Sequence, residues 1–317
     1  MPKLTKKMEN PKLSIIIVNW NTKELLSRCL ESLVSSKGLI FDKSPLTKKT
    51  KDKSRENLFL TEIIVIDNAS TDGSQEMVAQ KFPFVVLLKN KENLGFSKAN
   101  NQGIKIAKGK YILILNSDTI VKKTAIEILI DYLEQHREID IIGPKLINPD
   151  GSPQANCGRF PTLPIVAIML FKEHFGGSNL VRSSPLTSKQ VDWLMGAAFV
   201  AKKEVFETIG GFDEKIFMYM EEVEWFYRAA QSGFKTYFLK DAEIVHLGRG
   251  SAKKGKTDPI LNIYKGILYF YQKHRTFWEL ILVKLLLKTK ALLALAIGFL
   301  KNDSYLKNTY GQAFKIN

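Results

Sequence analysis

Four short runs of Val, Ile and Leu dominate the first half of this chain, and segments with helical periodicity separate most of them. The runs lie within residues 13–19, 62–67, 84–90 and 111–118. Strands that are apolar on both faces must be covered on both faces, which is typical of parallel sheets flanked by helices. The pattern therefore predicts an α/β fold with a mostly parallel sheet.

Amphipathic segments follow these runs along the chain. One apolar stripe recurs within residues 22–36, and the patterns at 96–109 and 122–136 also predict helices. After these helices we expect a strand at 139–147 and an irregular stretch at 152–190. A strand at 191–203 should lead into a short helix, followed by a helix at 221–233. The segments KTYFL and AEIVH predict two more strands, and the chain should be helical from residue 258 onward.

The chain divides by composition into three parts. Residues 1–12 form a basic N-terminal tail, residues 13–250 carry the α/β pattern, and residues 251–317 form a C-terminal helical segment. Within the α/β part, the Lys/Ser/Thr-rich segment 38–60 exceeds the usual helix-to-strand connection of about two to six residues. We interpret it as a basic surface insertion.

The chain is strongly basic, with a net charge of +15 from 47 Lys and Arg against 32 Asp and Glu. Such an excess either attracts an anionic partner or forms solvated faces that aid solubility. The basic runs at 43–55 and 249–256 contain no aromatic residues. Stacking platforms for nucleic acid are therefore not evident, and we expect no nucleic-acid partner.

Cysteine content and hydropathy bear on the cellular compartment. Cys29 and Cys157 are too few for a disulfide framework, which fits a reducing compartment. No apolar stretch precedes Pro11, and no run of about 18 apolar residues follows, so we expect neither a secretory signal nor a transmembrane helix. The expected location is cytoplasmic, peripheral on the inner face of the cell membrane.

Polar side chains follow three of the predicted strands. Asn19 and Asn21 end the first, Asp67 ends the second, and Asn116-Ser117-Asp118 end the fourth. In a parallel sheet these ends converge on one edge, where ligands bind. Neither the dinucleotide fingerprint nor the P-loop occurs in the sequence. A carboxylate-held Mg²⁺ or Mn²⁺ is the simplest remaining way to neutralise a bound phosphate.

Six blocks in order carry a family resemblance. They read SIIIVNWNTKELLSRCLESL, IIVIDNASTDGS, NLGFSKANNQGI, LILNSDT, GAAFVAKKEVFETIGGFDEKIFMYMEEVEWFYRAAQSGF and VHLGRGSA. Together they resemble the family 2 glycosyltransferases, with most likeness to the bacterial rhamnosyltransferase-like branch, over roughly residues 13–250. The resemblance implies a GT-A fold with a nucleotide-binding half and an acceptor half, and a metal-dependent enzyme that takes a sugar from a dTDP- or UDP-linked donor.

The resemblance also implies which residues bind the nucleotide sugar. Asp67 corresponds to the residue that reads the nucleobase; the alternative is a turn-closing role. Asn93, Gly95 and Asn100 match a block that closes over the nucleotide; the alternative is helix capping and tight-turn chemistry. The full predicted set is Asn19, Asn21, Asp67, Asn68, Asn93, Gly95, Asn100, Ser117 and Asp118.

The metal site is expected at Asp118 and His246. Asp118 matches the last acid of the family's D-x-D motif, whose first position is Asn116 here, as in rhamnosyltransferase-like members. His246 resembles the second metal or diphosphate contact. The alternatives are that Asp118 only caps the next helix and that His246 is structural.

The acid cluster at 221–224 carries the catalytic prediction. Glu222 matches the family's general base, usually Asp, and Glu221 is the alternative. Acids in the first turn of a helix are favoured by its dipole in any case. One base without an enzyme nucleophile predicts inversion at the anomeric carbon. Trp193 and Gly196 resemble the acceptor-side wall, although Trp193 could equally serve core packing.

The C-terminal stretch 261–302 mixes apolar residues with recurring lysines and aromatic side chains. This favours a helix lying at an anionic membrane surface, with packing on the enzyme or in a dimer as the alternative. The expected acceptor is a glycan, or a sugar linked to polyprenyl diphosphate, used in bacterial cell-surface polysaccharide synthesis. A nucleotidyltransferase, a non-catalytic scaffold and a binding module for nucleic acid or anionic surfaces are the other hypotheses; oligomeric state is left open.

Overall fold

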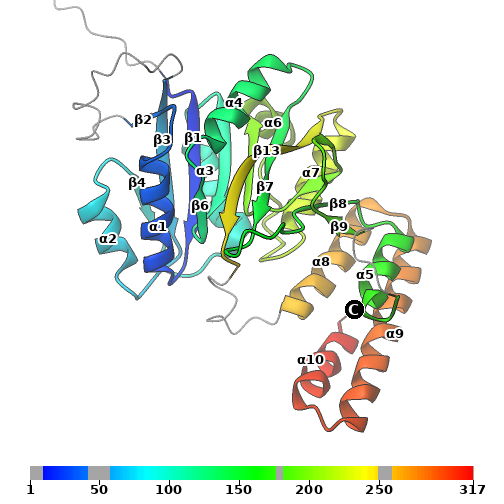
Figure 1. Ribbon diagram of the computed structural model, residues 1–317. Coiled ribbons are helices and arrows are strands. Elements are labelled where there is room, and N and C mark those ends of the chain that lie inside the picture. Colours follow the sequence, from blue (N-terminus) through cyan, green and yellow to red (C-terminus); the bar gives the residue numbers. More distant parts are fainter. Residues whose placement is uncertain (1–9, 42–57, 176–180, 249–258, 317) are drawn as a thin grey trace, which may run out of the picture.

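The computed structural model describes residues 10–41, 58–175, 181–248 and 259–316 (Figure 1). Its elements run in the order β1 (Leu13–Asn19), α1 (Lys23–Val34), β2 (Leu39–Phe41), β3 (Phe59–Asp67), α2 (Ser74–Lys81), β4 (Val86–Lys89), α3 (Gly95–Ile106), β5 (Tyr111–Asn116), β6 (Thr119–Val121), α4 (Ala125–Gln135), β7 (Ile141–Ile147), β8 (Cys157–Gly158), α5 (Leu163–Phe175), β9 (Arg182–Ser183), β10 (Lys189–Gln190), β11 (Trp193–Leu194), β12 (Ala198–Lys202), α6 (Lys203–Ile209), α7 (Glu221–Gln231), β13 (Thr236–His246), α8 (Pro259–His274), α9 (Phe277–Leu300) and α10 (Ser304–Phe314).

The large sheet has the order β10-β13-β7-β12-β5-β1-β3-β2, with β4 also paired to β3 and β6 to β13. The half of the sheet made by β5, β1, β3 and β2 is parallel, because β1 pairs in parallel with both β3 and β5, and β2 pairs in parallel with β3. Strand β12 lies antiparallel between β5 and β7. A second, small sheet has the order β11-β8-β9. The predicted mostly parallel α/β sheet is confirmed.

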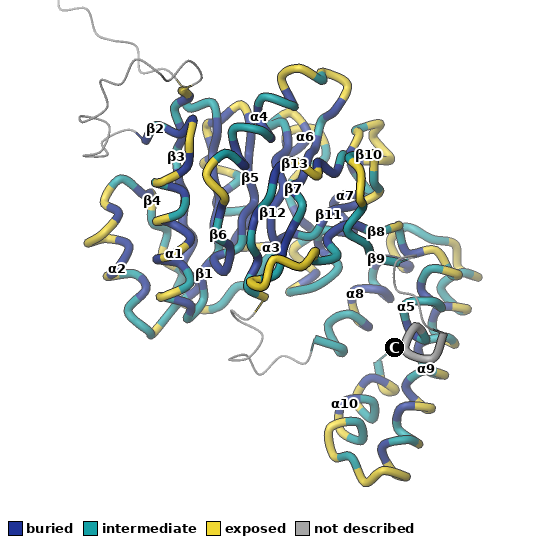
Figure 2. Tube along the Cα trace, viewed as in Figure 1, coloured by how far each residue is buried: buried dark blue, intermediate teal, exposed yellow. Residues whose placement is uncertain are grey.

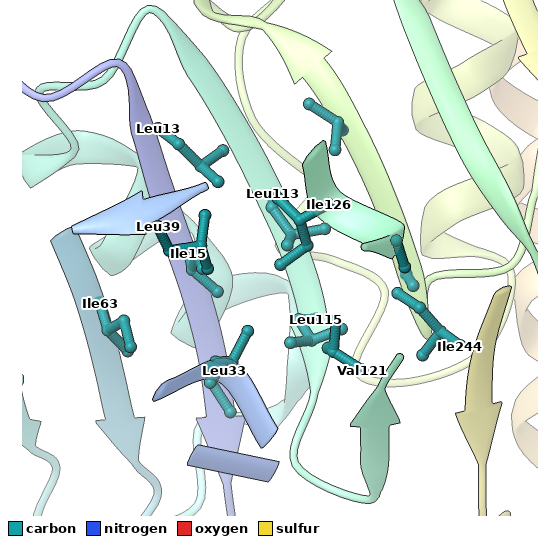
Figure 3. Close-up of a cluster of buried hydrophobic side chains, with 14 of the residues drawn as sticks. Leu13, Ile15, Leu33, Leu39, Ile63, Leu113, Leu115, Val121, Ile126 and Ile244 are labelled. Atoms are coloured by element: carbon teal, nitrogen blue, oxygen red, sulfur yellow. The ribbon is translucent and has the colours of Figure 1, made fainter. Parts of the chain in front are cut away.

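The alternation of side chains along β1 builds the two cores. Leu13, Ile15 and Ile17 belong to the apolar cluster that includes α1, α2 and α4, whereas Ile16 belongs to the cluster of α3, α6 and α7. Figure 3 shows Leu13 and Ile15 in the first of these clusters. All four side chains are fully buried. A strand buried on both faces has no polar face to show, and this explains the unbroken apolar run in the sequence.

Several boundaries differ from the sequence-based expectation. KTYFL and AEIVH form one strand, β13, whose pairing with β7 shifts register between Leu239 and Glu243. Residues 191–203 split into β11 and β12 and then enter α6. The stretch 152–190, expected to be irregular, contains helix α5. The apolar residues of α5 pack against other helices rather than against the sheet. In the segment 38–60 both ends are strands, β2 and the start of β3, while residues 42–57 lie outside the described part.

Helices α5, α8, α9 and α10 share a third apolar cluster and extend away from the sheet at the lower right of Figure 1. Helix α9 starts with a capping box, in which the Thr276 side chain accepts from the Glu279 backbone N–H and the Glu279 carboxylate accepts from the Thr276 N–H. Among the described residues, no helix combines the length and apolar character needed to cross a bilayer.

Candidate active site

A cavity of about 280 Å³ opens where β1, β3 and β5 end and α7 begins. Nine of the residues predicted from the sequence line it, namely Asn68, Asn93, Gly95, Ser117, Asp118, Gly196, Glu221, Glu222 and His246. The position agrees with the rule that open α/β sheets bind ligands outside the carboxyl ends of their strands.

Hydrogen bonds join the loops after β1 and β3 beside the cavity lining. Asn19 Nδ2 donates to Asp67 Oδ2 at 2.8 Å, and the Ser70 N–H donates to Asp67 Oδ1 at 2.8 Å. Gln75 Nε2 donates to the same Oδ1 at 2.7 Å. Asn21 Oδ1 accepts from the Thr71 N–H at 2.8 Å. These bonds hold the two loops side by side, next to Trp20 and Asn68, which line the cavity.

Five predicted site residues therefore do not line the cavity. Asn19, Asn21 and Asp67 belong to the loop network just described, and Asp67 is only 1% exposed. Asn100 is buried and donates to Phe96 O inside α3, while Trp193 is buried and donates from Nε1 to Arg159 O. The structure gives each a packing or positioning contact, and their direct contact with a ligand stays a prediction.

The block Asn93–Gly95 approaches the loop before α7 closely. Gly95 has φ +80°, and a Cβ there would lie 2.6 Å from Phe217 O. The Phe96 N–H donates to that same carbonyl oxygen at 3.0 Å. Asn68 Nδ2 donates to Gly95 O at 3.1 Å from the β3 side. A glycine is required at position 95, because both the positive φ and the contact exclude a side chain.

Asp118 and His246 lie together at one end of the cavity. Asp118 Oδ1 is 3.3 Å from His246 Nε2, and both side chains are about nine-tenths buried. His246 Nδ1 lies 2.7 Å from Gln154 Oε1, while Gln154 Nε2 donates to Asn148 Oδ1 at 2.9 Å. The Gln154 oxygen can only accept, so Nδ1 carries a proton and the Nε2 edge of the ring faces Asp118.

This donor set fits a divalent cation. A carboxylate oxygen and an imidazole nitrogen face each other at 3.3 Å here, and both groups are common ligands of Mn²⁺ or Mg²⁺. Within the described ranges no cluster of three His, Cys, Asp or Glu side chains could hold a metal. Asp118 and His246 would therefore share the ion with ligand oxygens, as Mg²⁺ typically does with phosphates.

The acid pair at the start of α7 follows a strained turn. Tyr219 and Met220 have φ values of 69° and 74°, which side chains other than glycine rarely adopt. Helix α8 presses on this turn at Gly266, where a Cβ would lie 2.7 Å from Met220 Cβ. Such strain persists only where surrounding structure enforces it, and it often marks functional sites. Here it places Glu221 and Glu222 at the cavity wall.

The two acids differ in access and charge. Glu221 is 5% exposed, and burial, followed by the Glu222 charge, raises its pKa well above the ordinary value. Burial also raises the pKa of Glu222, whereas its own backbone N–H, the Arg182 charge and the Gly196 N–H act in the opposite direction. Glu222 is the more accessible of the two. One carboxylate oxygen of each acid, Oε2, is buried and has no hydrogen-bond partner among the described residues.

Other residues of the cavity wall were missed by the sequence analysis. They are Val18, Trp20, Thr22, Phe96, Arg182, Met195, Ala197, Met218, Tyr219 and Gly248. Most lie next to a predicted position. Trp20 lies between the predicted Asn19 and Asn21, and Thr22 follows them, so including every residue after the first strand would have found both. Arg182 had no such signal, because it lies in the stretch 152–190 that showed no regular pattern.

Comparison with known proteins bears on the family and the fold. The family model described as Glycosyl transferase family 2 matches residues 14–173, just over half of the chain. An N-acetylglucosaminyl-diphospho-decaprenol L-rhamnosyltransferase of Mycobacterium tuberculosis is 26% identical over 235 residues, covering 68% of this chain and 76% of that protein. The low-salt glycan biosynthesis hexosyltransferase Agl10 of Haloferax volcanii is 26% identical over 243 residues, covering 74% and 66%.

Solved structures show the same fold. A crystal structure of S. aureus TarS, residues 1–349, superposes with a TM-score of 0.52 at 16% identity, covering 87% of this chain and 69% of that one. GalNAc-T7 with UDP, GalNAc and Mn²⁺ gives a TM-score of 0.54 at 18% identity, covering 83% and 50%. The expected GT-A fold is confirmed. By its sequence blocks, its fold and the match over residues 14–173, the chain belongs to glycosyl transferase family 2.

Proposed function

We propose that this enzyme transfers rhamnose or a related hexose from a dTDP- or UDP-linked donor to a hydroxyl of a lipid-linked glycan, with inversion at the anomeric carbon. One observation carries the proposal: the acid pair of α7 and the Asp118–His246 pair line the same cavity. Two relatives, a rhamnosyltransferase and a hexosyltransferase, support the choice of sugar. The rhamnosyltransferase's name contains an N-acetylglucosaminyl-diphospho-decaprenol acceptor, which supports the choice of acceptor class.

Glu222 acts as the general base in this mechanism. Its side chain lines the cavity and is more accessible than that of Glu221, so its carboxylate can accept the proton of an acceptor hydroxyl. As the proton moves to Glu222, the hydroxyl oxygen attacks the anomeric carbon from the face opposite the leaving diphosphate. A single displacement of this kind inverts the anomeric configuration.

Asp118 and His246 serve the leaving group. A Mg²⁺ or Mn²⁺ ion held there would offset the negative charge that develops on the departing nucleoside diphosphate. The Gln154 contact fixes the imidazole ring, and Ser117 Oγ lies 3.0 Å from Thr22 Oγ1 on the neighbouring loop. These contacts keep the end of β5 in place while the charge moves.

The assay that tests this function is sugar transfer from dTDP-rhamnose to a diphosphate-linked N-acetylglucosamine acceptor in the presence of Mn²⁺. We expect Asp118→Asn to lower turnover about 100-fold or more, because the ion's stabilisation of the leaving group is worth several kcal/mol. The variant should also bind dTDP equally with and without Mn²⁺, measured by titration calorimetry. Asp131→Asn on α4 is the matched control. Undiminished turnover in Asp118→Asn would remove this residue from the site.

We further propose that α9 rests on an anionic membrane surface. Its inner stripe (Val283, Leu287, Ala291, Ala294 and Gly298) is buried, but an outer stripe of seven residues is exposed (Figure 2). The outer stripe consists of Trp278, Leu282, Leu285, Thr289, Leu292, Ala296 and Phe299, which recur every three or four positions. It contains no charge and runs for about 30 Å.

Lysines flank this outer stripe on both sides. Lys284 and Lys288 lie on one side of the helix and Lys290 and Lys301 on the other, as helical spacing dictates. The acids in this region, Glu279 and Asp303, both cap helices. An uncharged apolar stripe between rows of cations matches the boundary between acyl chains and anionic headgroups.

The membrane proposal predicts a specific loss of binding. Replacing Leu285, Leu292 and Phe299 together by Ser should weaken sedimentation with phosphatidylglycerol vesicles by tenfold or more, since each buried apolar side chain contributes about 1.5–3 kcal/mol. Phosphatidylcholine vesicles should bind the wild type less, and added salt should weaken the binding. The matched control replaces the exposed Val86, Ile106 and Leu186 of the sheet domain. A triple variant that binds vesicles normally but changes from dimer to monomer would contradict the membrane assignment.

A further inference from the structure

Arg182 occupies a wall of the active-site cavity that the proposed mechanism leaves unused. It lies on β9, in the small sheet with β8 and β11. Met195, Gly196 and Glu222 line the cavity beside it. A guanidinium group therefore shares one enclosed space with the general base and with the wall expected to face the acceptor.

The guanidinium has far fewer partners than donors. Arginine carries five N–H donors and no acceptor. Here Nη2 donates to Met195 Sδ at 3.4 Å, a weak acceptor, and the buried Nε has no partner among the residues that the structure describes. No described carboxylate lies at ion-pair distance from Arg182. A partly buried cation without an anion at ion-pair distance is costly: burial lowers the pKa of this guanidinium, and the charges of Glu222 and Cys157 offset that effect only in part.

An anion in the cavity would compensate this charge. Guanidinium groups bind phosphate oxygens through paired N–H donors, with stronger hydrogen bonds than neutral groups make. Two diphosphates take part in the proposed reaction, that of the nucleotide-sugar donor and that of the lipid-linked acceptor. Both diphosphates offer the same chemistry to Arg182, so the position of Arg182 in the fold decides which of them it binds.

The location favours the acceptor. The donor diphosphate is assigned to Asp118 and His246, at the ends of β5 and β13. Arg182 belongs instead to the small sheet, whose strand β11 carries Trp193. Strand β9 of this small sheet follows α5 in the chain, and α5 packs against α9, the helix with the exposed apolar stripe. A lipid-linked acceptor that reaches Glu222 from this side brings its phosphates past β9.

We propose that Arg182 binds the diphosphate of the lipid-linked acceptor and so places the acceptor sugar against Glu222. This inference rests on the proposed function for its substrate class. Arg182 is a binding residue here, and the proton still passes from the acceptor hydroxyl to Glu222. The role predicts that removing the guanidinium affects acceptors with a diphosphate and spares acceptors without one.

The kinetic test compares two acceptors. With farnesyl-diphospho-N-acetylglucosamine we expect Arg182→Gln to raise the acceptor KM roughly 10- to 100-fold, the range for a lost hydrogen bond to a charged group, and to leave the donor KM unchanged. With the neutral octyl N-acetylglucosaminide the variant should keep the acceptor KM of the wild type, while loss of the Arg182 charge, which lowers the pKa of Glu222, moves only the acid limb of kcat to higher pH. Arg182→Lys should recover part of the loss, and Arg137→Gln, an exposed arginine in the loop before β7, is the control.

A binding test separates this inference from the proposed function. Farnesyl diphosphate should bind to the Glu222→Gln protein and lose affinity roughly tenfold or more when Arg182→Gln is added, while dTDP affinity stays constant. If the wild type transfers no sugar but this difference is seen, the proposed function fails and the diphosphate site stands. Equal loss with charged and neutral acceptors, or a loss confined to dTDP, overturns the inference, because Arg182 would then serve Glu222 or the donor.

Discussion

We expect the Glu222→Gln variant to lose about 10²–10⁴-fold in kcat, the usual contribution of a general base. Gln keeps the shape of the side chain but cannot take the proton of the acceptor hydroxyl. The KM values for donor and acceptor should change little, because the cavity wall is preserved. Steady-state sugar transfer measures both quantities, and Glu204→Gln, an exposed acid on α6, is the matched control.

Glu221 provides the internal comparison. It is more deeply buried than its neighbour, so Glu221→Gln should lower kcat much less than Glu222→Gln. If Glu221→Gln lowers kcat more, the assignment of the base is wrong.

The raised pKa of Glu222 gives this prediction a pH signature. The base works only when deprotonated, so the acid limb of kcat/KM should lie above the pH at which an ordinary glutamate titrates, about 4.3. The same burial affects folding. Between the unfolded pKa and the higher folded pKa the native state holds a proton that the unfolded chain releases, so stability falls as pH rises through that window. Glu222→Gln should therefore be at least as stable as the wild type at neutral pH, as urea unfolding will show.

A second large effect is expected at Glu224, two residues further along α7. Its carboxylate is fully buried and accepts from Arg228 Nε at 3.0 Å and from Lys273 Nζ at 2.8 Å, and His274 Nε2 lies 3.0 Å away. Lys273 also donates to Asp213 Oδ2 at 2.6 Å. The cluster joins α7 to α8, the helix that presses on the turn before Glu221. Glu224→Ala leaves Arg228 without its carboxylate partner, whereas Lys273 keeps only Asp213 among its described partners.

We expect Glu224→Ala to lower the free energy of unfolding by about 3 kcal/mol, the low end for breaking a buried ion pair, since Arg228 and Lys273 keep some access to water. Urea unfolding measures this change. Glu207→Gln is the control, because its ion pair with Lys203 on α6 is exposed and should contribute less than about 1 kcal/mol. A change at position 224 no larger than the control would show that α7 is held by apolar packing alone.

The fold was largely predictable because its signals are local. The alternation and periodicity of apolar residues report burial in the neighbouring layers, and they placed the strands at Leu13–Asn19 and Ile141–Ile147 almost to the residue. The misses share one cause. Helix α5 is apolar around most of its surface, and β13 is interrupted by a register shift, so neither shows the period expected for its element.

The site was predictable where chemistry coincides with a strand or helix end. Asp118, His246 and Glu222 lie at such ends, and all three line the cavity. Asp67 was predicted to bind the nucleotide sugar, but the structure places it in a network of loop hydrogen bonds outside the cavity lining. Which of several polar residues at one edge points into the cavity depends on hydrogen bonds between loops about 50 residues apart, as the Asn19–Asp67 pair shows.

The amino-acid sequence by itself determined the α/β class, the edge of the sheet that binds ligand, the order of the family blocks and the mixed apolar and basic character of the C-terminal helices. Each follows from residues close together in the chain. Only the tertiary structure decided that Arg182 lines the same cavity as Glu222, that Glu224 joins α7 to α8, and that α9 keeps an uncharged stripe uncovered. The physical reason is that a charge's partners, and the face of a helix that stays open, are set by long-range packing.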